Sequence, residues 1–349
     1  MTKKVLIAVL ACCLLFTGLF AGLAACTTNN TDTSADSSAT SDTAGTSSDQ
    51  AATDSTTPVA TTPGPVTFTD DLGNTVTVNN PQRVVATMGS FAKIWELAGG
   101  TLIGASDDAY TYSGYDLTSP DITKVGDFSS LNMETILSLN PDFVIMTGAA
   151  AGRPGMAAQT DYKDTLEASG ITVAYFVVTD FSDYLHMLNI CTQITGRADL
   201  YKTNGTDVQS RIDAITATVP ADAANKRVII MTTYSGGVMV QNSSTQTGAI
   251  LSDLGVTNIA DSTPSLLSNF SLEALIATDP DYIFVVPMAV NMDNATQFLD
   301  DATSNNPAWS QLSAVQDGHY IVLDPGLFQY KPNENWDQSY QVLYDYLFK

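Results

Sequence analysis

The sequence predicts an α/β fold made of two lobes of similar topology. Three observations carry this prediction. Short apolar strands alternate with helical segments from Val66 onward, which is typical of a mostly parallel sheet covered by helices on both faces. The stretch NMETILSLNPDFVIM, residues 132–146, is nearly repeated as SLEALIATDPDYIFV, residues 271–285. Between the two copies, apolar residues spaced four, three and four apart mark a long amphipathic helix: Val208, Ile212, Ile215 and Val219.

Residues 1–25 have the pattern of a secretory signal peptide. Lys3 and Lys4 precede an apolar or small-residue run from Val5 to Ala25, and polar residues follow. A run of this length could also remain as an anchor helix that spans the bilayer. The small residues before Cys26 favour cleavage, because Leu-Ala-Ala-Cys resembles the bacterial lipobox, which implies acylation of Cys26. We therefore expect a lipid anchor at Cys26 on the extracytoplasmic face of the cell membrane.

Residues 26–65 are predicted to form a disordered tether. From Thr27 to Pro65 the chain is almost entirely Thr, Ser, Ala, Asp, Asn, Gly and Pro, with no aromatic and no basic residue. Such a composition cannot bury enough apolar area to offset the entropy of ordering. A flexible chain of about 40 residues spans roughly 30–40 Å, enough to hold a folded domain clear of the lipid.

Charge and cysteine content exclude some partners. The formal charge of the 349 residues is −23, and it becomes −25 when the two positive charges of Lys3 and Lys4 are removed. Such a surface repels nucleic acid, and the remaining basic residues are scattered along the chain.

Without the signal peptide and with Cys26 acylated, the fold keeps only Cys191, so no internal disulfide can form. Its apolar helical context predicts a buried structural cysteine.

The first lobe is expected over residues 66–180. It begins with a β-hairpin, because Thr67–Thr69 and Thr75–Val78 alternate around turn residues. The elements that follow are a strand at Arg83–Thr87, a helix at Phe91–Leu97 ended by two glycines, a strand at Leu102–Ala105, a helix and a strand within residues 132–146, and a strand at Ile171–Val178.

Connecting helices are expected over residues 181–220, and the second lobe over residues 221–349. The first connecting helix ends near Gly196, and the amphipathic helix follows it. The second lobe repeats the order of the first, with a strand at Arg227–Met231, a helix at Thr247–Leu254 and a strand at Val256–Ala260 before the repeated helix-Pro-Asp-strand unit. Open α/β sheets bind ligands beyond the carboxyl ends of their strands, so two facing lobes form one cleft.

Several motifs occur in a fixed order along the folded part: TDDLG at residues 69–73, PQRVV at 81–85, VGD at 125–127, NME at 132–134, NPDFVI at 140–145 and VLDP at 322–325. No single motif is diagnostic, but together they resemble the class III substrate-binding proteins of ABC importers for iron complexes, haem and corrinoids. The resemblance covers residues 66–349. It implies two Rossmann-like lobes joined by a rigid long helix, a ligand held in the cleft between them, and docking onto an ABC permease dimer with its ATPase.

Glu134 and Glu273 occupy equivalent positions in the repeat. Each follows a predicted N-cap, Asn132 or Ser271, by two residues, so its carboxylate lies in the first helical turn and complements the helix dipole. This local role alone would account for both residues. The family resemblance implies a further role, in which one acidic residue on each lobe meets an arginine pocket on each permease subunit. We expect Glu134 and Glu273 to be this docking pair.

Loops that follow the strands supply the predicted ligand-binding residues. Aromatic side chains in these loops would give flat contact surfaces for a bulky organic ligand, although each could equally be a packing residue. The predicted set is Ser90, Phe91, Tyr110, Tyr112, Arg153, Tyr234, Met288, Phe328, Tyr330 and Lys331.

Basic residues near the predicted cleft are few, chiefly Arg153 and Lys331. Haem propionates and catecholate siderophores are anionic and usually require a cluster of basic donors. A ferric siderophore of lower charge, such as a hydroxamate complex, or a corrinoid fits better. A haem- or cobalamin-binding protein of the same fold stays an alternative. A bare metal ion fits poorly, because imidazole is its usual ligand and both histidines, His186 and His319, have ordinary structural contexts. We expect no metal site and no cofactor.

Two other classes of protein stay open. An enzyme would need signatures that this sequence lacks, because neither a G-x-S-x-G elbow nor a G-x-x-x-x-G-K loop is present. A surface sensor or adhesin that binds the same ligand without transport would share every feature described above. A permease and an ATPase encoded beside the protein would distinguish the importer. We expect a monomeric binding protein and not an enzyme.

Overall fold

The computed structural model describes residues 64–111, 114–150, 158–234, 237–268, 271–288 and 307–349, together with residues 297, 300 and 303. All of them belong to one unit, residues 60–349. The predicted signal peptide, Cys26 and almost all of the predicted tether lie outside the described residues. Among the helices that are described, none has both the length and the apolarity needed to cross a membrane.

The first lobe contains a five-stranded parallel sheet in the order β5-β4-β3-β8-β9. Its strands are β3 (Val84–Ala86), β4 (Gly104–Ala105), β5 (Thr123–Lys124), β8 (Phe143–Thr147) and β9 (Thr172–Phe176). Two antiparallel hairpins accompany the sheet: β1 (Val66–Thr69) with β2 (Thr75–Val78), as predicted, and β6 (Gly126–Asp127) with β7 (Ser130–Leu131).

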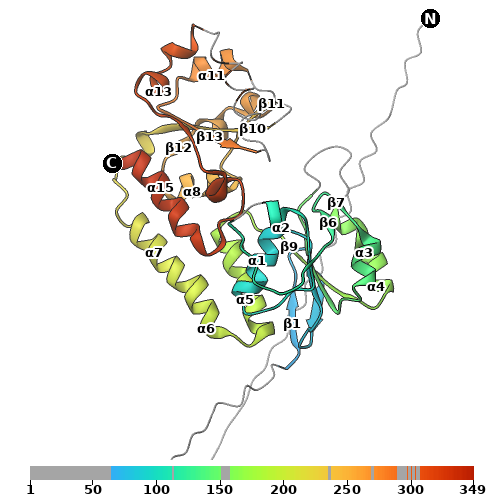
Figure 1. Ribbon diagram of the computed structural model, residues 1–349. Coiled ribbons are helices and arrows are strands. Elements are labelled where there is room, and N and C mark those ends of the chain that lie inside the picture. The colour runs from blue at the N-terminus through green and yellow to red at the C-terminus, as the bar shows by residue number, and fades with distance from the viewer. Residues whose placement is uncertain are drawn as a thin grey trace, which may run out of the picture. The chain divides into compact units, whose positions relative to one another are not determined.

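Helices cover both faces of this sheet (Figure 1). Because successive strand residues point to opposite faces, Ala86 and Ile145 pack against one layer of helices while Val85 and Val144 pack against the other. The first layer consists of α1 (Gly89–Leu97) and α5 (Phe181–Thr195), and the second of α3 (Met133–Ser138) and α4 (Lys163–Ala168). Two short helices complete the lobe: α2 (Asp108–Thr111) follows β4, and η1 (Gln159–Tyr162) directly precedes α4.

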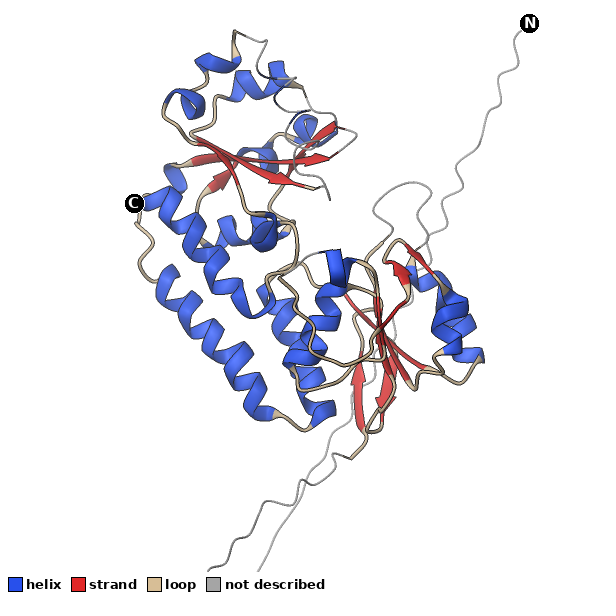
Figure 2. Ribbon diagram, viewed as in Figure 1, coloured by secondary structure: helices blue, strands red, loops and turns tan. Residues whose placement is uncertain are grey.

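The second lobe has a sheet separate from that of the first lobe (Figure 2). Its strand order is β11-β10-β13-β14, and β12 pairs with the beginning of β10. Its strands are β10 (Arg227–Tyr234), β11 (Gly237–Gln241), β12 (Thr257–Asn258), β13 (Tyr282–Pro287) and β14 (Tyr320–Val322). One face packs against α8 (Gln246–Asp253) and α15 (Trp336–Phe348), and the other against α9 (Ile259–Ser262), α10 (Pro264–Ser268), α11 (Leu272–Thr278) and α13 (Ser313–Gln316). The remaining short helices are η3 (Ala223–Asn225), η4 (Trp309–Gln311), α14 (Pro325–Phe328) and η5 (Asn333–Asn335).

The two lobes share their central topology, as the sequence repeat predicts. In the first lobe β3 pairs in parallel with β4 on one side and β8 on the other. In the second lobe β10 pairs in parallel with β12 and β13 in the same way. The two copies of the repeated stretch form the same pair of elements in each lobe. They are α3 followed by β8 in the first lobe and α11 followed by β13 in the second.

The Pro-Asp dipeptides have the same structural role in both lobes. Asp142 accepts hydrogen bonds from the backbone N–H groups of Gln82 (2.8 Å) and Arg83 (2.9 Å). Asp281 accepts the equivalent bond from the backbone N–H of Arg227 (2.7 Å). These carboxylates fix the start of the central strand in each lobe.

The arginine side chains complete this arrangement. The Arg83 guanidinium donates to the carbonyls of Leu139 and Asn140 at the end of α3. The Arg227 guanidinium donates to the carbonyls of Thr278 and Asp279 at the end of α11. Each arginine therefore satisfies carbonyl groups that a helix C-terminus leaves without intrahelical partners.

The connection between the lobes is helical. The α5 helix ends at Gly196, which has the left-handed conformation expected of a C-cap (φ 71°). A continuous helical stretch follows, made of α6 (Ala198–Tyr201), a π-helical turn at Lys202–Thr206 and α7 (Asp207–Thr216). The predicted amphipathic helix is therefore present.

Side chains attach this helical stretch to both lobes. The Tyr184 hydroxyl donates to the carbonyl of Asn204 in the π-helical turn (2.8 Å), and the Asn204 side chain donates to the carbonyl of Leu97 (2.9 Å). At the other end, Arg211 on α7 forms an ion pair with Asp337 on α15. One hydrophobic cluster includes residues of α1, α5, α7, α8 and α15, so the inner helices of both lobes belong to a common core.

Several predicted elements have different bounds in the structure. The helix expected at Phe91 begins two residues earlier, at Gly89. The strand expected at Leu102–Ala105 is formed only by its last two residues. The strand expected at Val256–Ala260 is limited to Thr257–Asn258, because the Asn258 side chain accepts a hydrogen bond from the Ala260 N–H and starts α9 there.

Candidate functional site

The segment Leu327–Trp336, named the bridging segment here, contacts both lobes where their sheets end. It follows β14, begins within α14 and ends at the first residue of α15, and so continues from the carboxyl end of a strand of the second sheet. Gln246 at the start of α8 donates its side-chain N–H groups to the carbonyls of Leu327 (3.0 Å) and Tyr330 (3.2 Å). Asn333 donates to the carbonyl of Ser90 at the start of α1 (3.3 Å). The bridging segment is therefore bonded to the first turn of a helix in each lobe.

Side chains of the bridging segment also contact the first lobe directly. The Tyr330 ring meets the Tyr115 ring edge to face, with centroids 6.2 Å apart. Lys93 on α1 forms an ion pair with Glu334 at 3.6 Å. The two lobes thus meet through aromatic, polar and charged contacts at the carboxyl end of β3.

Several polar atoms buried at this junction lack a hydrogen-bonding partner among the described residues. They are Ser90 Oγ, Gln246 Oε1, Asn333 Oδ1 and Trp336 Nε1. Such atoms are uncommon inside proteins, because a buried polar group without a partner is destabilising. Their grouping shows that the junction contains buried polar groups beside the common hydrophobic core.

Lys331 lies within the same segment and is partly buried. Removal of water from its ammonium group lowers the pKa of Lys331 to about 8, although the carboxylates of Asp183 and Asp180 act in the opposite direction. Among the described carboxylates, none lies within 4.0 Å of its Nζ atom to form an ion pair. Lys331 therefore presents a cation at the junction of the lobes that is weakly solvated and not directly paired within the described part of the chain.

Tyrosine side chains near the strand ends have perturbed hydroxyl groups. Tyr110 on α2 is 40% exposed, and the Lys124 ammonium lies 4.7 Å from the centre of its ring. Burial, together with the carboxylates of Asp107 and Glu96, raises the pKa of Tyr110. Burial and the Asp108 carboxylate likewise raise the pKa of Tyr330. Both hydroxyls therefore stay protonated and can donate hydrogen bonds at neutral pH.

Tyr234 and Met288 lie at the carboxyl ends of two neighbouring strands of the second sheet. Tyr234 is the last residue of β10, and Met288 directly follows β13. The backbone N–H of Met288 donates to the carbonyl of Thr233, so the two strand ends are held together. Both side chains are partly buried. This edge of the second sheet is the one at which a ligand is expected.

Three predicted ligand residues are buried. Phe91 is 1% exposed and Phe328 is 3% exposed, and both belong to the hydrophobic core. The expectation that they give flat exposed surfaces is therefore corrected: α1 begins at Gly89, so Phe91 is already on the helical face that packs toward the sheet. Ser90 is also buried, and its backbone carbonyl accepts the hydrogen bond from Asn333. Tyr112 and Arg153 lie outside the described residues.

Two residues that sequence reasoning missed lie at the carboxyl end of the first sheet. Gln159 is buried and forms hydrogen bonds to Thr87, Thr147 and Phe128. Phe128, in the turn between β6 and β7, is 38% exposed. The signal available in the sequence was an aromatic residue within a two-residue turn directly after the VGD motif. Nothing in the sequence marked Gln159, because its partners are 72, 31 and 12 residues away.

Glu134 and Glu273 are both exposed, in the first turns of α3 and α11. The predicted N-caps are present: Asn132 accepts from the Thr135 N–H (3.0 Å) and Ser271 from the Ala274 N–H (3.2 Å). The two glutamates therefore occupy equivalent surface positions on the two lobes.

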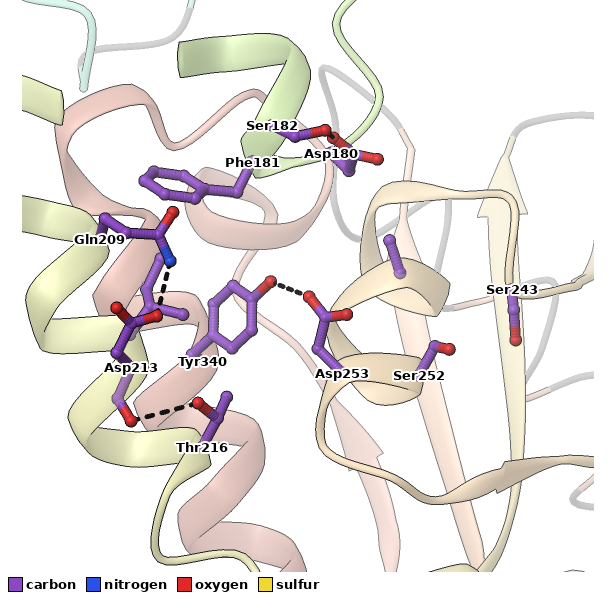
Figure 3. A pocket seen from close by; sticks show the side chains of 12 residues that line it. Asp180, Phe181, Ser182, Gln209, Asp213, Thr216, Ser243, Ser252, Asp253 and Tyr340 are labelled. Atoms are coloured by element: carbon purple, nitrogen blue, oxygen red, sulfur yellow. Dashed lines mark hydrogen bonds between the residues drawn. The ribbon is translucent and has the colours of Figure 1, made fainter. Parts of the chain in front are cut away.

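A pocket of about 530 Å³ lies between α7, α8 and α15, next to the start of α5 (Figure 3). It is acidic, with Asp180, Asp213 and Asp253 in its wall. These carboxylates already accept hydrogen bonds, since Asp253 accepts from Tyr340 and Asp213 from Gln209. Of the eight predicted ligand residues that the structure describes, none lines this pocket. We therefore place the candidate site at the bridging segment and the strand ends.

The two histidines have structural surroundings. His319 stacks on the Tyr282 ring at 4.2 Å, and its Nδ1 lies 3.1 Å from the carbonyl of Asp281. His186 Nε2 lies 3.3 Å from a carboxylate oxygen of Asp71. Within the described part of the chain, no group of three or more His, Cys, Asp or Glu side chains is placed to hold a metal ion.

Comparison with protein families gives a match over most of the folded part. The family model described as "Periplasmic binding protein" matches residues 84–327. The Fe(3+)-citrate-binding protein YfmC of Bacillus subtilis is 27% identical over 258 residues, which cover 73% of this chain and 77% of the relative. The iron(3+)-hydroxamate-binding protein FhuD of the same organism is 25% identical over 268 residues, or 74% of this chain and 79% of the relative. A putative ABC transporter substrate-binding lipoprotein of B. subtilis, YhfQ, is 25% identical over 279 residues, or 74% and 81%.

Solved structures share the fold. The triscatecholate siderophore-binding protein FeuA of B. subtilis, complexed with ferri-bacillibactin, superposes with a TM-score of 0.61 at 18% identity, covering 80% of this chain and 96% of FeuA. The haem complex of S. aureus IsdE gives a TM-score of 0.61 at 15% identity, covering 76% and 99%. At these identities the likeness establishes the two-lobed architecture alone.

Proposed function

Because this chain belongs to the periplasmic binding protein family, we propose that it is the extracytoplasmic solute-binding lipoprotein of an ABC importer. It captures a ferric siderophore between its lobes and delivers the complex to the membrane permease. The observation that carries this proposal is the junction itself, where the bridging segment ties the carboxyl ends of two equivalent sheets together. Ligands of open α/β sheets bind at such edges. In this proposal the chain acts as a monomer and performs no catalysis.

The proposed ligand contacts come from the exposed and partly buried residues at the junction. Tyr110, Tyr234 and Tyr330 offer aromatic faces and hydroxyl donors, and Met288 offers an adaptable apolar surface. Lys331 offers a positive charge. The Ser90 hydroxyl is a further donor if the lobes separate during binding. Tyr112 and Arg153 remain proposed contacts from the sequence.

The charges near the site favour a chelate of low net charge. Three singly charged hydroxamates neutralise Fe³⁺, whereas catecholates leave the complex strongly anionic. Asp107, Asp108 and Asp180 follow strands or start helices at this edge, and Lys331 is the cation in the bridging segment. Carboxylates repel an anionic complex at close range. A ferric hydroxamate is therefore the preferred ligand, and a corrinoid or haem is the alternative within the same fold class.

Membrane attachment and permease docking complete the proposal. Acylation of Cys26 attaches the protein to the membrane, and the tether of residues 26–65 gives it reach. Glu134 and Glu273 each meet one permease subunit. Their exposure on equivalent helices supports this role, since a docking pair must be free to contact two related partners.

The test is a direct binding measurement on the purified chain. Native mass spectrometry and quenching of tryptophan fluorescence would be recorded with four probes: ferrioxamine B, ferric citrate, haem and cobalamin. We expect one-to-one binding of ferrioxamine B that is at least about tenfold tighter than binding of ferric citrate. Binding of none of the four would overturn the proposal. Preferential binding of haem or cobalamin would replace the siderophore by the alternative ligand.

A further inference from the structure

Gln159 is a buried amide whose hydrogen-bonding capacity is fully used. Its exposed fraction is 2%. The side-chain oxygen accepts from the Thr87 hydroxyl and from the Thr147 backbone N–H (3.0 Å). The side-chain nitrogen donates to the carbonyls of Thr87 (3.0 Å) and Phe128 (2.8 Å). An amide has two donors and two acceptor sites, so this side chain has no free hydrogen-bonding position.

These partners come from three different segments at one edge of the first sheet. Thr87 directly follows β3, Thr147 ends β8, and Phe128 lies in the turn that connects β6 to β7. The two strands are neighbours and parallel, so their carboxyl ends meet at the same edge. Gln159 therefore ties a turn from outside the sheet to the ends of its two central strands.

The turn that carries Phe128 is also fixed from within. Gly126 has a positive φ of 95°, and the Asp127 carboxylate accepts from the backbone N–H of Ser129 (2.8 Å) and from its hydroxyl. A substituent at Gly126 would approach the backbone of Asn132 to 2.9 Å, so the turn has little freedom to adopt another path. The position of the Phe128 backbone is thus set by both its own turn and Gln159.

The Phe128 side chain remains exposed although its backbone is held. An aromatic ring that is 38% exposed on a rigid turn gains little from packing. It does provide an apolar surface with a low entropy cost for a ligand that covers it. Its backbone carbonyl lies within hydrogen-bonding distance of Gln159 at the carboxyl-end edge of the first sheet, where the proposed function places the chelate.

We propose that Phe128 is a ligand-contact residue of the first lobe and that Gln159 is the positioning residue that holds it at the edge of the cleft. The inference rests on the proposed function, because it assigns to Phe128 the apolar part of the same chelate. Its role complements that of Tyr330, which belongs to the bridging segment and contacts the first lobe through Tyr115.

Amide hydrogen exchange in the ligand-free protein tests the role of Gln159. Gln159→Met keeps the length of the side chain and removes all four hydrogen bonds, so the amides of Ser129 and Thr147 should exchange at least about tenfold faster. Thr87→Val is the matched control, because it removes the Thr87 hydroxyl and keeps the bonds from Gln159 to Phe128 and Thr147. In the control, exchange at Ser129 should stay within about threefold of the wild type. Equal exchange at Ser129 in the two variants would overturn the positioning role.

Binding of ferrioxamine B tests the role of Phe128. Phe128→Ala should weaken binding about tenfold or more with an unchanged melting temperature, whereas Phe128→Tyr should bind within about threefold of the wild type. Tyr346→Ala is the control, because Tyr346 is an exposed aromatic residue on α15, at 48% exposure. Wild-type affinity of Phe128→Ala would overturn the contact role. If the wild type itself binds none of the four probes, the proposed function and the contact role fall together, and the exchange data still decide the role of Gln159.

Discussion

At the scale of single residues, Lys331 shows how burial changes the chemistry of a side chain. Its ammonium group lies at the junction of the lobes, and loss of hydration lowers its pKa to about 8 from the ordinary value of 10.5. The unfolded chain keeps the ordinary value. Between about pH 8 and 10.5 the unfolded state therefore binds more protons than the folded state, and stability from this group rises with pH. Below pH 8 both states are protonated, and the folded state carries the full cost of the desolvated charge.

Lys331→Met should therefore stabilise the ligand-free protein at neutral pH. We expect the free energy of unfolding at pH 7 to rise by about 1–2 kcal/mol, because methionine fills similar space without a charge. The difference from the wild type should shrink as pH rises from 8 to 10. Urea unfolding at pH 7, 8, 9 and 10 measures it.

The control for this prediction is Lys202→Met, at a lysine whose side chain is 71% exposed. Its effect should stay within about 0.5 kcal/mol at every pH. A stability difference for Lys331→Met that does not change with pH would contradict a lowered pKa.

At the scale of elements, contacts of an arginine and of an aspartate join the central strand of each lobe to a helix. In the first lobe they join β3 to α3, and in the second lobe they join β10 to α11. Asp142 holds the start of β3, and Asp281 holds the start of β10. The corresponding arginines bind the last carbonyls of α3 and α11. The same set of contacts in both lobes explains why the Pro-Asp pair is kept in both copies of the sequence repeat.

Asp142→Ala and Asp281→Ala should each destabilise the fold by about 1–2 kcal/mol, because a charged acceptor is removed from backbone N–H groups. Asp142→Ala should have the larger effect, since it loses two bonds (2.8 and 2.9 Å) and Asp281→Ala loses one (2.7 Å). Midpoints of chemical denaturation measure both. Asp222→Ala, at an exposed aspartate without a side-chain capping bond, is the control and should change stability by less than about 0.5 kcal/mol. The reverse order of Asp142 and Asp281 would contradict the bond count.

At the scale of the whole molecule, the two lobes share a core and a helical connection. The hydrophobic cluster that includes α1, α5, α7, α8 and α15 draws residues from both lobes. The bridging segment adds polar contacts between them at the strand ends. In the proposed function, ligand capture and permease docking involve different surfaces of one connected unit, so mutation should separate them.

Glu134→Ala combined with Glu273→Ala should abolish uptake and leave ligand binding intact. Both side chains are exposed and belong to the short helices α3 and α11, so their removal should change the affinity for ferrioxamine B by less than about twofold. Each single variant should retain partial uptake, because one lobe can still dock. Uptake of radiolabelled ferric complex by cells that contain the permease measures the effect.

Glu167→Ala is the control for docking, since Glu167 is an exposed glutamate on α4 that pairs with Lys163. Its uptake should equal that of the wild type. Loss of ligand affinity in the double variant, or normal uptake, would contradict the docking role.

The sequence by itself determined the two-lobed α/β architecture. The repeat of residues 132–146 at 271–285 and the alternation of strands and helices depend on local periodicity, which is legible in one chain. The N-caps at Asn132 and Ser271 and the C-cap at Gly196 were also predictable, because each acts within a few residues of its own position.

Only the tertiary structure decided which residues belong to the candidate site. The sequence predicted Phe91 and Phe328 as contact surfaces, yet both side chains are buried in the hydrophobic core, because the positions of their helices orient them toward it. Gln159 carried no local signal, because its hydrogen bond to the Phe128 carbonyl joins residues 31 positions apart. Burial, desolvation of Lys331 and the meeting of strand ends arise from contacts between distant segments, and a single sequence does not encode those contacts in any local pattern.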